Sequence, residues 1–141
     1  MTNAAILYPL LAQVALTFVL MIWLAVVRTR TASRGEVRLA EIALDASGWP
    51  DGSVKIANCV LNQFQLPVLF YLLCVLLMIT ANLSTQQIIL AWIFVASRVF
   101  HVFIHTGTNN VLHRFYAFLA GFVTLIVMWL LFAFDIIFKG L

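Results

Sequence analysis

The sequence predicts an all-α integral membrane protein, folded as an up-down bundle of four transmembrane helices. The 141-residue chain is 65% hydrophobic and only 9% charged, and its mean hydropathy of +1.09 lies far outside the range of soluble domains. It also contains four apolar stretches, each long enough to cross a hydrocarbon layer of about 30 Å. Because only helices and closed barrels satisfy their backbone hydrogen bonds in lipid, these stretches should form a helix bundle.

The expected bundle is one domain over residues 1–141, with a polar connection, residues 28–55, after the first helix. The four predicted membrane helices are residues 4–27, 56–80, 86–106 and 115–138. The first of them is too long to be a removable signal peptide and lacks a basic start and a cleavage site. Within the connection, apolar and charged residues alternate over residues 36–45 in a pattern typical of a short surface helix.

The distribution of Lys and Arg predicts the orientation in the membrane. The first and third connections hold most of the basic residues, namely Arg28, Arg30, Arg34, Arg38, Lys55 and Arg114. The opposite side offers only Lys139. These two connections should therefore be cytoplasmic and both termini non-cytoplasmic. The net charge of +3 fits this topology signal, and no basic cluster is dense enough to indicate nucleic-acid binding.

The second predicted helix begins with a polar stripe. Asn58, Asn62 and Gln65 are spaced i, i+4 and i+7, with Lys55 one turn earlier, so that one helix face carries all four side chains. Pro67 removes a backbone donor and should kink the helix where the stripe meets its apolar half. The amides suit either a ligand site or hydrogen bonds that join neighbouring helices.

Residues 97–114 are the most unusual stretch, because they carry two arginines and all three histidines of the chain. Arg98, His101 and His105 share one face of the third predicted helix, and Arg114 follows beyond a turn that is rich in asparagine. An ionisable group costs roughly 3 kcal/mol or more at mid-bilayer, so function should be sought here. Guanidinium, amide and imidazole groups suit an anionic, carboxylate-bearing ligand, and an arginine beside a sulfur favours the thiolate.

Other chemistries fit this stretch less well. A haem needs axial histidines on facing elements, whereas His101 and His105 share one helix. Their spacing suits a metal ion, but no Asp, Glu or Cys lies on the same face, so we expect no metal. A proton-coupled exporter would need an embedded carboxylate, which the first three spans lack. Cys59 and Cys74 lie too far apart along one helix to form a disulfide and are expected to be packing residues.

The sequence resembles the MAPEG family, the membrane-associated proteins in eicosanoid and glutathione metabolism, along nearly its whole length. The similar segments are VRTR after the first helix, NQFQLPVLFY in the second, and SRVFHVFIHTGTNNVLHRF from the third into the fourth. The last two look like bacterial members in particular. The resemblance implies a homotrimer in the bacterial inner membrane that binds glutathione between subunits. Many members use glutathione to conjugate or reduce lipophilic electrophiles.

The resemblance also implies roles for individual residues. Arg114 lies near the position of the arginine that stabilises the glutathione thiolate. His105 is a candidate proton donor for a different reason, because an imidazole changes its charge near neutral pH. The residues expected to bind the peptide are Arg28, Asn58, Asn62, Gln65, Arg98 and His101.

Three positions depart from the family pattern. Gln65 replaces an acidic residue that would pair with the glutathione ammonium group, His105 replaces an aromatic hydroxyl, and Phe115 or Phe118 replaces a tyrosine. Two functions are therefore carried forward: a membrane-bound glutathione transferase or peroxidase, and a non-catalytic lipid-binding or scaffolding protein with a degenerate glutathione site. In a third interpretation, the polar residues only hold the helices of the trimer together.

Overall fold

A computed structural model describes residues 3–43 and 45–139, and this part of the chain is built of helices without any strand. The elements in chain order are η1 (Asn3–Ile6), α1 (Leu7–Ser33), α2 (Leu39–Ile42), η2 (Ala46–Gly48), α3 (Asp51–Asn62), α4 (Leu66–Ile79), α5 (Thr85–Thr106) and α6 (Val111–Lys139).

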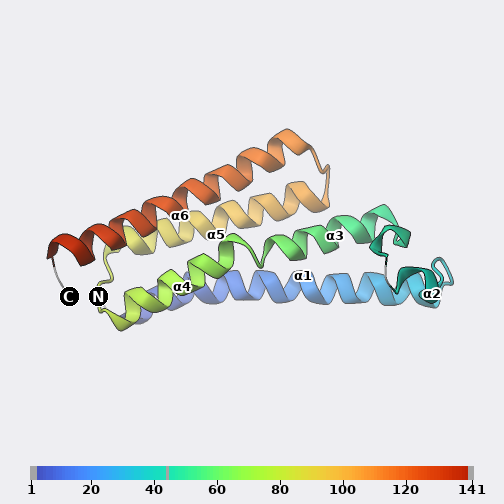
Figure 1. Cartoon of the computed structure of the whole chain (residues 1–141), viewed down its shortest axis with the longest axis horizontal. Coiled ribbons are helices and arrows are strands. Elements are labelled where there is room, and N and C mark those ends of the chain that lie inside the picture. Colours follow the sequence, from blue (N-terminus) through green and yellow to red (C-terminus); the bar gives the residue numbers. More distant parts are fainter. Residues whose placement is uncertain (1–2, 44, 140–141) are drawn as a thin grey trace.

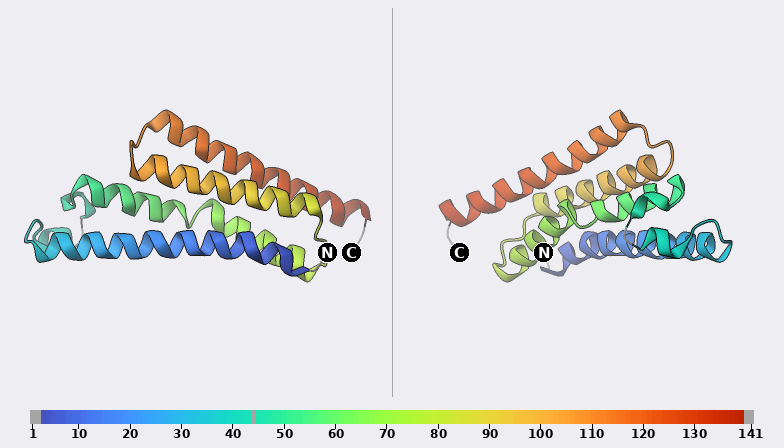
Figure 2. Two further views of the ribbon diagram at one scale, coloured as in Figure 1. Left: turned by 180° about the vertical axis from the view of Figure 1, so that it is seen from behind. Right: turned by 45° about the vertical axis from the view of Figure 1, so that its right-hand side comes forward.

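The long helices run up and down side by side and form one elongated bundle (Figures 1 and 2). Both termini lie at one end, whereas the α1–α3 connection and the α5–α6 turn lie at the other (Figure 1). Four helical stretches are long and apolar enough to cross a membrane: Ala4–Ser33, Asp51–Ile79, Thr85–Thr106 and Val111–Phe138. The prediction of an integral membrane protein with four membrane helices is therefore confirmed.

Several helices extend further than the sequence predicts. Helix α1 continues to Ser33 instead of ending at Val27, the second span begins at Asp51 instead of Ile56, and α6 begins at Val111. The polar connection is therefore residues 34–50 rather than 28–55. The prediction used hydropathy alone, but polar residues can continue a helix once it has left the hydrocarbon. Asp51 in the first turn of α3 even stabilises that helix end through the helix dipole.

The second span is interrupted rather than merely kinked. Helix α3 ends at Asn62 and α4 begins at Leu66, with Pro67 in the first turn of α4. The buried side chain of Gln63 lies in the interruption; its Nε2 donates to the carbonyl of Cys59 at 3.3 Å, and its Oε1 accepts from Gln13 Nε2 at 2.9 Å. These bonds offset part of the cost of a helix break inside the membrane.

The connection after α1 holds only short elements. The predicted surface helix over residues 36–45 is represented by α2, and Leu44, which belonged to its pattern, lies outside the described residues. The carboxylate of Asp45 accepts hydrogen bonds from the backbone N–H and the hydroxyl of Ser47, which lower the pKa of Asp45. The Arg28 guanidinium lies 4.8 Å from the centre of the Trp49 ring and ties the connection to α1.

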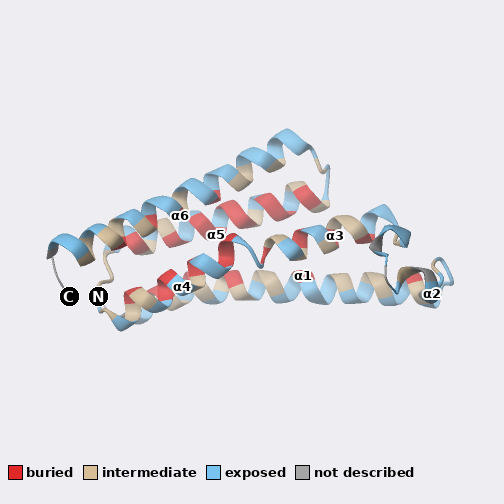
Figure 3. Cartoon of the chain, viewed as in Figure 1, coloured by how far each residue is buried: buried red, intermediate tan, exposed pale blue. Residues whose placement is uncertain are grey.

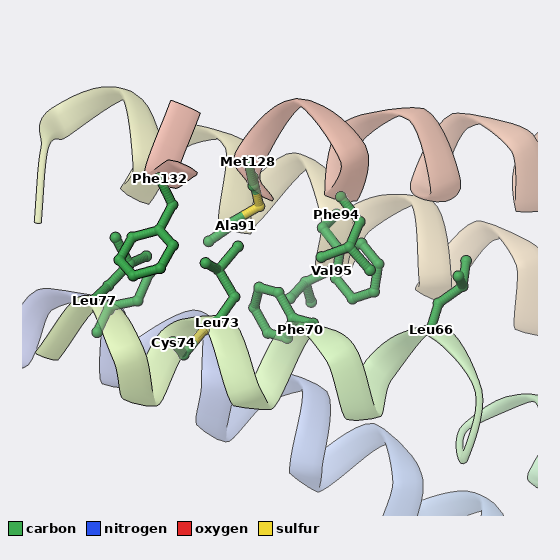
Figure 4. Packing of buried hydrophobic residues seen from close by; sticks show 12 residues of the cluster. Leu66, Phe70, Leu73, Cys74, Leu77, Ala91, Phe94, Val95, Met128 and Phe132 are labelled. Atoms are coloured by element: carbon green, nitrogen blue, oxygen red, sulfur yellow. The ribbon is translucent and has the colours of Figure 1, made fainter. Parts of the chain in front are cut away.

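The main apolar core lies between α4, α5 and α6, where buried faces meet (Figures 3 and 4). At its centre the rings of Phe70 and Phe94 stack with centroids 4.6 Å apart. A smaller cluster joins α1, α3 and α5 through Leu20, Cys59 and Val102. Thus α5 contributes to both clusters. The outer faces of the helices carry many exposed apolar side chains, as contact with lipid requires.

A single glycine allows α5 and α6 to approach closely. A Cβ at Gly121 would lie 2.6 Å from the Ser97 hydroxyl oxygen and 3.6 Å from Arg98 Cδ. The Ser97 hydroxyl is in turn held by a hydrogen bond to the Phe94 carbonyl at 2.6 Å. Small residues at such crossings let membrane helices pack through their backbones. Gly121 therefore sets the α5–α6 distance beside Arg98.

We predict that Gly121→Ala destabilises the protein by about 1 to 3 kcal/mol, the usual effect of overpacking. The measurement is thermal unfolding in detergent micelles. The double variant Ser97→Ala/Gly121→Ala should recover most of the loss, because it removes the oxygen that the new methyl group meets. Ala120→Val, on the exposed face of the same turn, is the control and should change little. A Gly121→Ala protein as stable as the wild type would contradict this close packing.

Candidate functional site

A polar cavity of about 380 Å³ opens between α3, α5 and α6, at the end of the bundle that holds the α5–α6 turn. Its wall is formed by Asn58, Asn62, His101, His105, Val111, Arg114, Phe115 and Phe118. The fold thus brings together five of the residues that the sequence singled out: Asn58, Asn62, His101, His105 and Arg114. We call this space the polar cavity.

Helix α5 presents two imidazoles to the polar cavity. His101 and His105 lie one turn apart and are almost fully buried, with ring centroids 5.4 Å apart in a T-shaped arrangement. The Nδ1 atom of each ring is buried and has no hydrogen-bond partner among the described residues. Buried polar atoms are normally paired, so these two nitrogens are candidates for contact with a ligand.

The turn before α6 positions Arg114. The Asn110 side chain caps α6, because its Oδ1 accepts hydrogen bonds from the N–H groups of Leu112 at 3.0 Å and His113 at 3.1 Å. Asn109 has a left-handed backbone, with φ of 51°, and its Oδ1 accepts from Arg114 Nη1 at 3.0 Å. The two asparagines therefore fix the guanidinium at the cavity wall.

Helix α3 supplies the amides. The Asn62 side chain donates to the carbonyl of Asn58 at 3.0 Å, and both residues line the polar cavity. A second cavity, of about 250 Å³, adjoins this site, since Asn58, His105 and Arg114 line both. Its own wall adds Asp51 and Lys55 from the first turns of α3. The polar surface thus continues from the bundle interior to the N-terminus of α3. There it contains the Asp51 carboxylate and the Lys55 ammonium group.

Arg98 lies outside the wall of the polar cavity but directly beside it. Its side chain is fully buried, and none of its three guanidinium nitrogens has a hydrogen-bond partner among the described residues. The guanidinium carbon lies 5.4 Å from the centre of the Phe118 ring, which is part of the cavity wall. A cation–π contact compensates only part of the cost of burying this charge.

Two predicted site residues are placed elsewhere. Arg28 lines a separate cavity of about 240 Å³ between α1 and α3, which shares Asn58 with the polar cavity. Gln65 is exposed in the interruption between α3 and α4 and lies in neither cavity wall. The predicted stripe assumed one continuous helix, but α3 ends at Asn62, so Gln65 no longer shares its face.

The sequence reasoning missed Cys59 and Asp51 as neighbours of this site, whereas it had placed Lys55 on the same stripe as Asn58 and Asn62. The expectation of no metal rested on the face of a single helix, on which no Cys lies beside the two histidines. In the structure, Cys59 of α3 brings its thiol to within 4.8 Å of a ring nitrogen of both His101 and His105. Contacts between helices of this kind leave no periodic signal in the sequence.

We predict that Arg98→Met keeps or raises the thermal stability of the protein without added anions. The substitution replaces an unpaired buried cation by an apolar side chain of similar length, which removes a desolvation cost. Melting curves in detergent test this, with the exposed Arg34→Met as the control. A fall in melting temperature of more than a few degrees would mean that Arg98 is already paired within the protein.

The comparisons with known proteins give one match. The model of the MAPEG family matches residues 6–134, which is nearly the entire described chain and includes every residue of the polar cavity. No curated protein and no solved structure matches the sequence. The family match agrees with the four membrane helices and with the resemblance seen in the second, third and fourth helices. The chain belongs to the MAPEG family of membrane proteins.

Proposed function

We propose that the protein is a glutathione transferase or peroxidase of the membrane, which binds glutathione in the polar cavity and transfers it to lipophilic electrophiles. The observation that carries this proposal is the division of the cavity wall. One part holds the amides of Asn58 and Asn62, the two imidazoles and the Arg114 guanidinium, and the other part is apolar. Such a site suits a polar thiol beside a hydrophobic substrate, and family membership supports the same chemistry.

Arg114 is proposed to stabilise the ionised thiol. A positive charge beside a thiol favours the thiolate, the reactive nucleophile, and a guanidinium fixed by Asn109 keeps its position during the reaction. In a substitution, the thiol proton leaves to water, a sulfur–carbon bond forms and the bond to the leaving group breaks. In an addition to an activated double bond, His105 takes up the thiol proton and returns it to the carbanion that develops, which restores the neutral imidazole.

The lipophilic substrate is proposed to enter from the bilayer. Val111, Phe115 and Phe118 of α6 form the apolar wall of the polar cavity. Val111 and Phe115 are more than half exposed on a helix that is long and apolar enough to span the membrane. A substrate dissolved in lipid therefore reaches the thiol without crossing water.

The carboxylate of Asp51 is proposed to take the place of the acidic residue that Gln65 replaces. Glutathione carries an ammonium group, which the family resemblance pairs with an acidic side chain, and Gln65 has no charge. Asp51 lines the adjoining cavity, which shares Asn58, His105 and Arg114 with the polar cavity. The ammonium group would bind Asp51, and a carboxylate would bind Lys55 or Arg114.

The assembly and orientation are part of the same proposal. We infer a homotrimer, as the family resemblance implies, with each ligand between two copies. The Nε atom of Arg28 is buried without a partner among the described residues, and in a trimer this arginine would face the ligand of an adjacent copy. The end of the bundle with Arg28, Arg34, Lys55 and Arg114 would lie in the cytoplasm of a bacterium, with the protein in its inner membrane.

We predict that Arg114→Ala lowers kcat/KM for the conjugation of glutathione with a generic aromatic electrophile by about 100-fold, which is the low end for loss of one charge-stabilising donor. The measurement uses purified protein in detergent. His113→Ala is the matched control, because His113 is the exposed neighbour in the sequence and lies outside the cavity wall. An active enzyme that tolerates Arg114→Ala would refute the role of Arg114.

Asp51→Asn should weaken glutathione binding by about 10-fold or more, since a hydrogen bond to a charged group contributes roughly 1.5 to 3 kcal/mol. Isothermal calorimetry with glutathione measures the effect. A glutathione analogue without the amino group should bind the variant and the wild type equally well. Asp45→Asn, in the α1–α3 connection, is the control carboxylate and should have no effect. Equal loss for both ligands would argue against an Asp51–ammonium contact.

A non-catalytic lipid-binding protein is the second candidate function. It is favoured by a separate cavity of about 320 Å³ with an almost wholly apolar wall between α4 and α6, which includes Leu69, Phe122, Trp129 and Leu130. The replacement of the expected acidic residue by Gln65 also favours a non-catalytic protein, because it removes the charge that would pair with the glutathione ammonium group. The calorimetric titration separates the two candidates, because absence of heat at millimolar glutathione would exclude the transferase.

A further inference from the structure

Three side chains with metal-binding atoms meet where α3 faces α5. Cys59, His101 and His105 each place one donor atom within 4.8 Å of the other two. All three side chains are buried, with relative exposures of 0%, 2% and 3%. A buried ligand set contributed by two helices has the form of a built metal site rather than of a surface cluster.

Packing alone does not explain this arrangement. Cys59 contacts Leu20 and Val102 and would suit an apolar core by itself. The two imidazoles, however, are buried with Nδ1 atoms that have no hydrogen-bond partner among the described residues. A metal ion bound to the thiolate and to the Nδ1 atom of each ring would give these nitrogens a partner, whereas binding through Nε2 would leave each Nδ1 as it is.

The donor set and the surrounding charges indicate the kind of ion. No carboxylate joins the cluster among the residues that the structure describes, so Mg²⁺ and Ca²⁺ are not favoured. One thiolate and two imidazoles suit Cu(I) or Zn²⁺. The buried guanidinium of Arg98 lies on the same face of α5, one turn before His101. A Zn²⁺–thiolate pair would leave a positive charge beside Arg98, whereas a Cu(I)–thiolate pair is neutral.

We propose that Cys59, His101 and His105 form a three-coordinate site for Cu(I) in the wall of the polar cavity. On binding, the Cys59 thiol releases its proton to solvent as the copper–sulfur bond forms. Because His101 and His105 line the cavity, the ion is within reach of a small molecule there. The site does not require glutathione and goes beyond the proposed transferase function. While copper is bound, His105 is a ligand and does not serve as the proton donor of the addition reaction.

The test is a titration of the full-length protein in detergent with Cu(I) supplied as its bicinchoninate complex, in ascorbate under nitrogen and without glutathione. Loss of the absorbance of the complex reports transfer of copper to the protein. The wild type should take up one copper ion per chain. Cys59→Ala should bind copper at least 100-fold more weakly, since loss of even a supporting partner outside the ligand set costs roughly 10- to 100-fold.

Cys74→Ala is the matched control, because Cys74 is the other buried cysteine and belongs to the main apolar core. It should bind copper like the wild type. Copper uptake that is unaffected by Cys59→Ala, or lost equally in both variants, would overturn the proposal.

X-ray absorption of the copper-loaded wild type gives a readout that does not depend on variants: one sulfur and two nitrogen ligands are expected, and any other ligand set would refute the site. Tighter binding of Zn²⁺ than of Cu(I) would overturn the choice of metal.

Discussion

The arrangement at the polar end of the bundle depends on one buried cation, Arg98. A guanidinium cannot lose its charge to adapt to a dry environment, so its surroundings must accommodate it. Gly121 lets α6 approach the preceding residue Ser97, since a Cβ there would lie 2.6 Å from the Ser97 hydroxyl oxygen, and Phe118 offers the guanidinium the face of a ring. Neither contact neutralises the charge. Arg98 therefore lies beside the polar cavity, where an anion bound in that cavity would offset its charge.

The interruption of the second span divides it into two halves that pack differently. Helix α4 packs against α6, α5 and α1, whereas α3 packs against α1 and α5. The cavity lies between α3, α5 and α6. Gln63 makes the interruption tolerable, because its amide bonds both to Gln13 on α1 and to the Cys59 carbonyl. The same pair of bonds fixes the end of α3 and with it the position of the Cys59 thiol opposite His101 and His105.

The sequence predicts the four spans well because crossing a membrane is a local requirement that each stretch must meet by itself. Helical periodicity likewise places Arg98, His101 and His105 on one face, as the structure has them. Gln65 shows where periodicity fails, since the helix that would carry it stops three residues earlier. The Gln13–Gln63 bond and the approach of Cys59 to the histidines depend on how separate helices dock, which no spacing within one helix encodes.

Charge balance connects the proposed ligand with the proposed metal. Three fixed cations, Arg98, Arg114 and Lys55, surround the two adjoining cavities, against one carboxylate, Asp51, so two positive charges are in excess. Glutathione has two carboxylates and one ammonium group and carries one net negative charge, which becomes two when its thiol ionises. The excess therefore favours the thiolate over the thiol. Cu(I) bound to the Cys59 thiolate adds no net charge and leaves this balance intact, whereas Zn²⁺ would add one positive charge. The electrostatics of the site thus permit a copper ion and a thiolate ligand to be bound together.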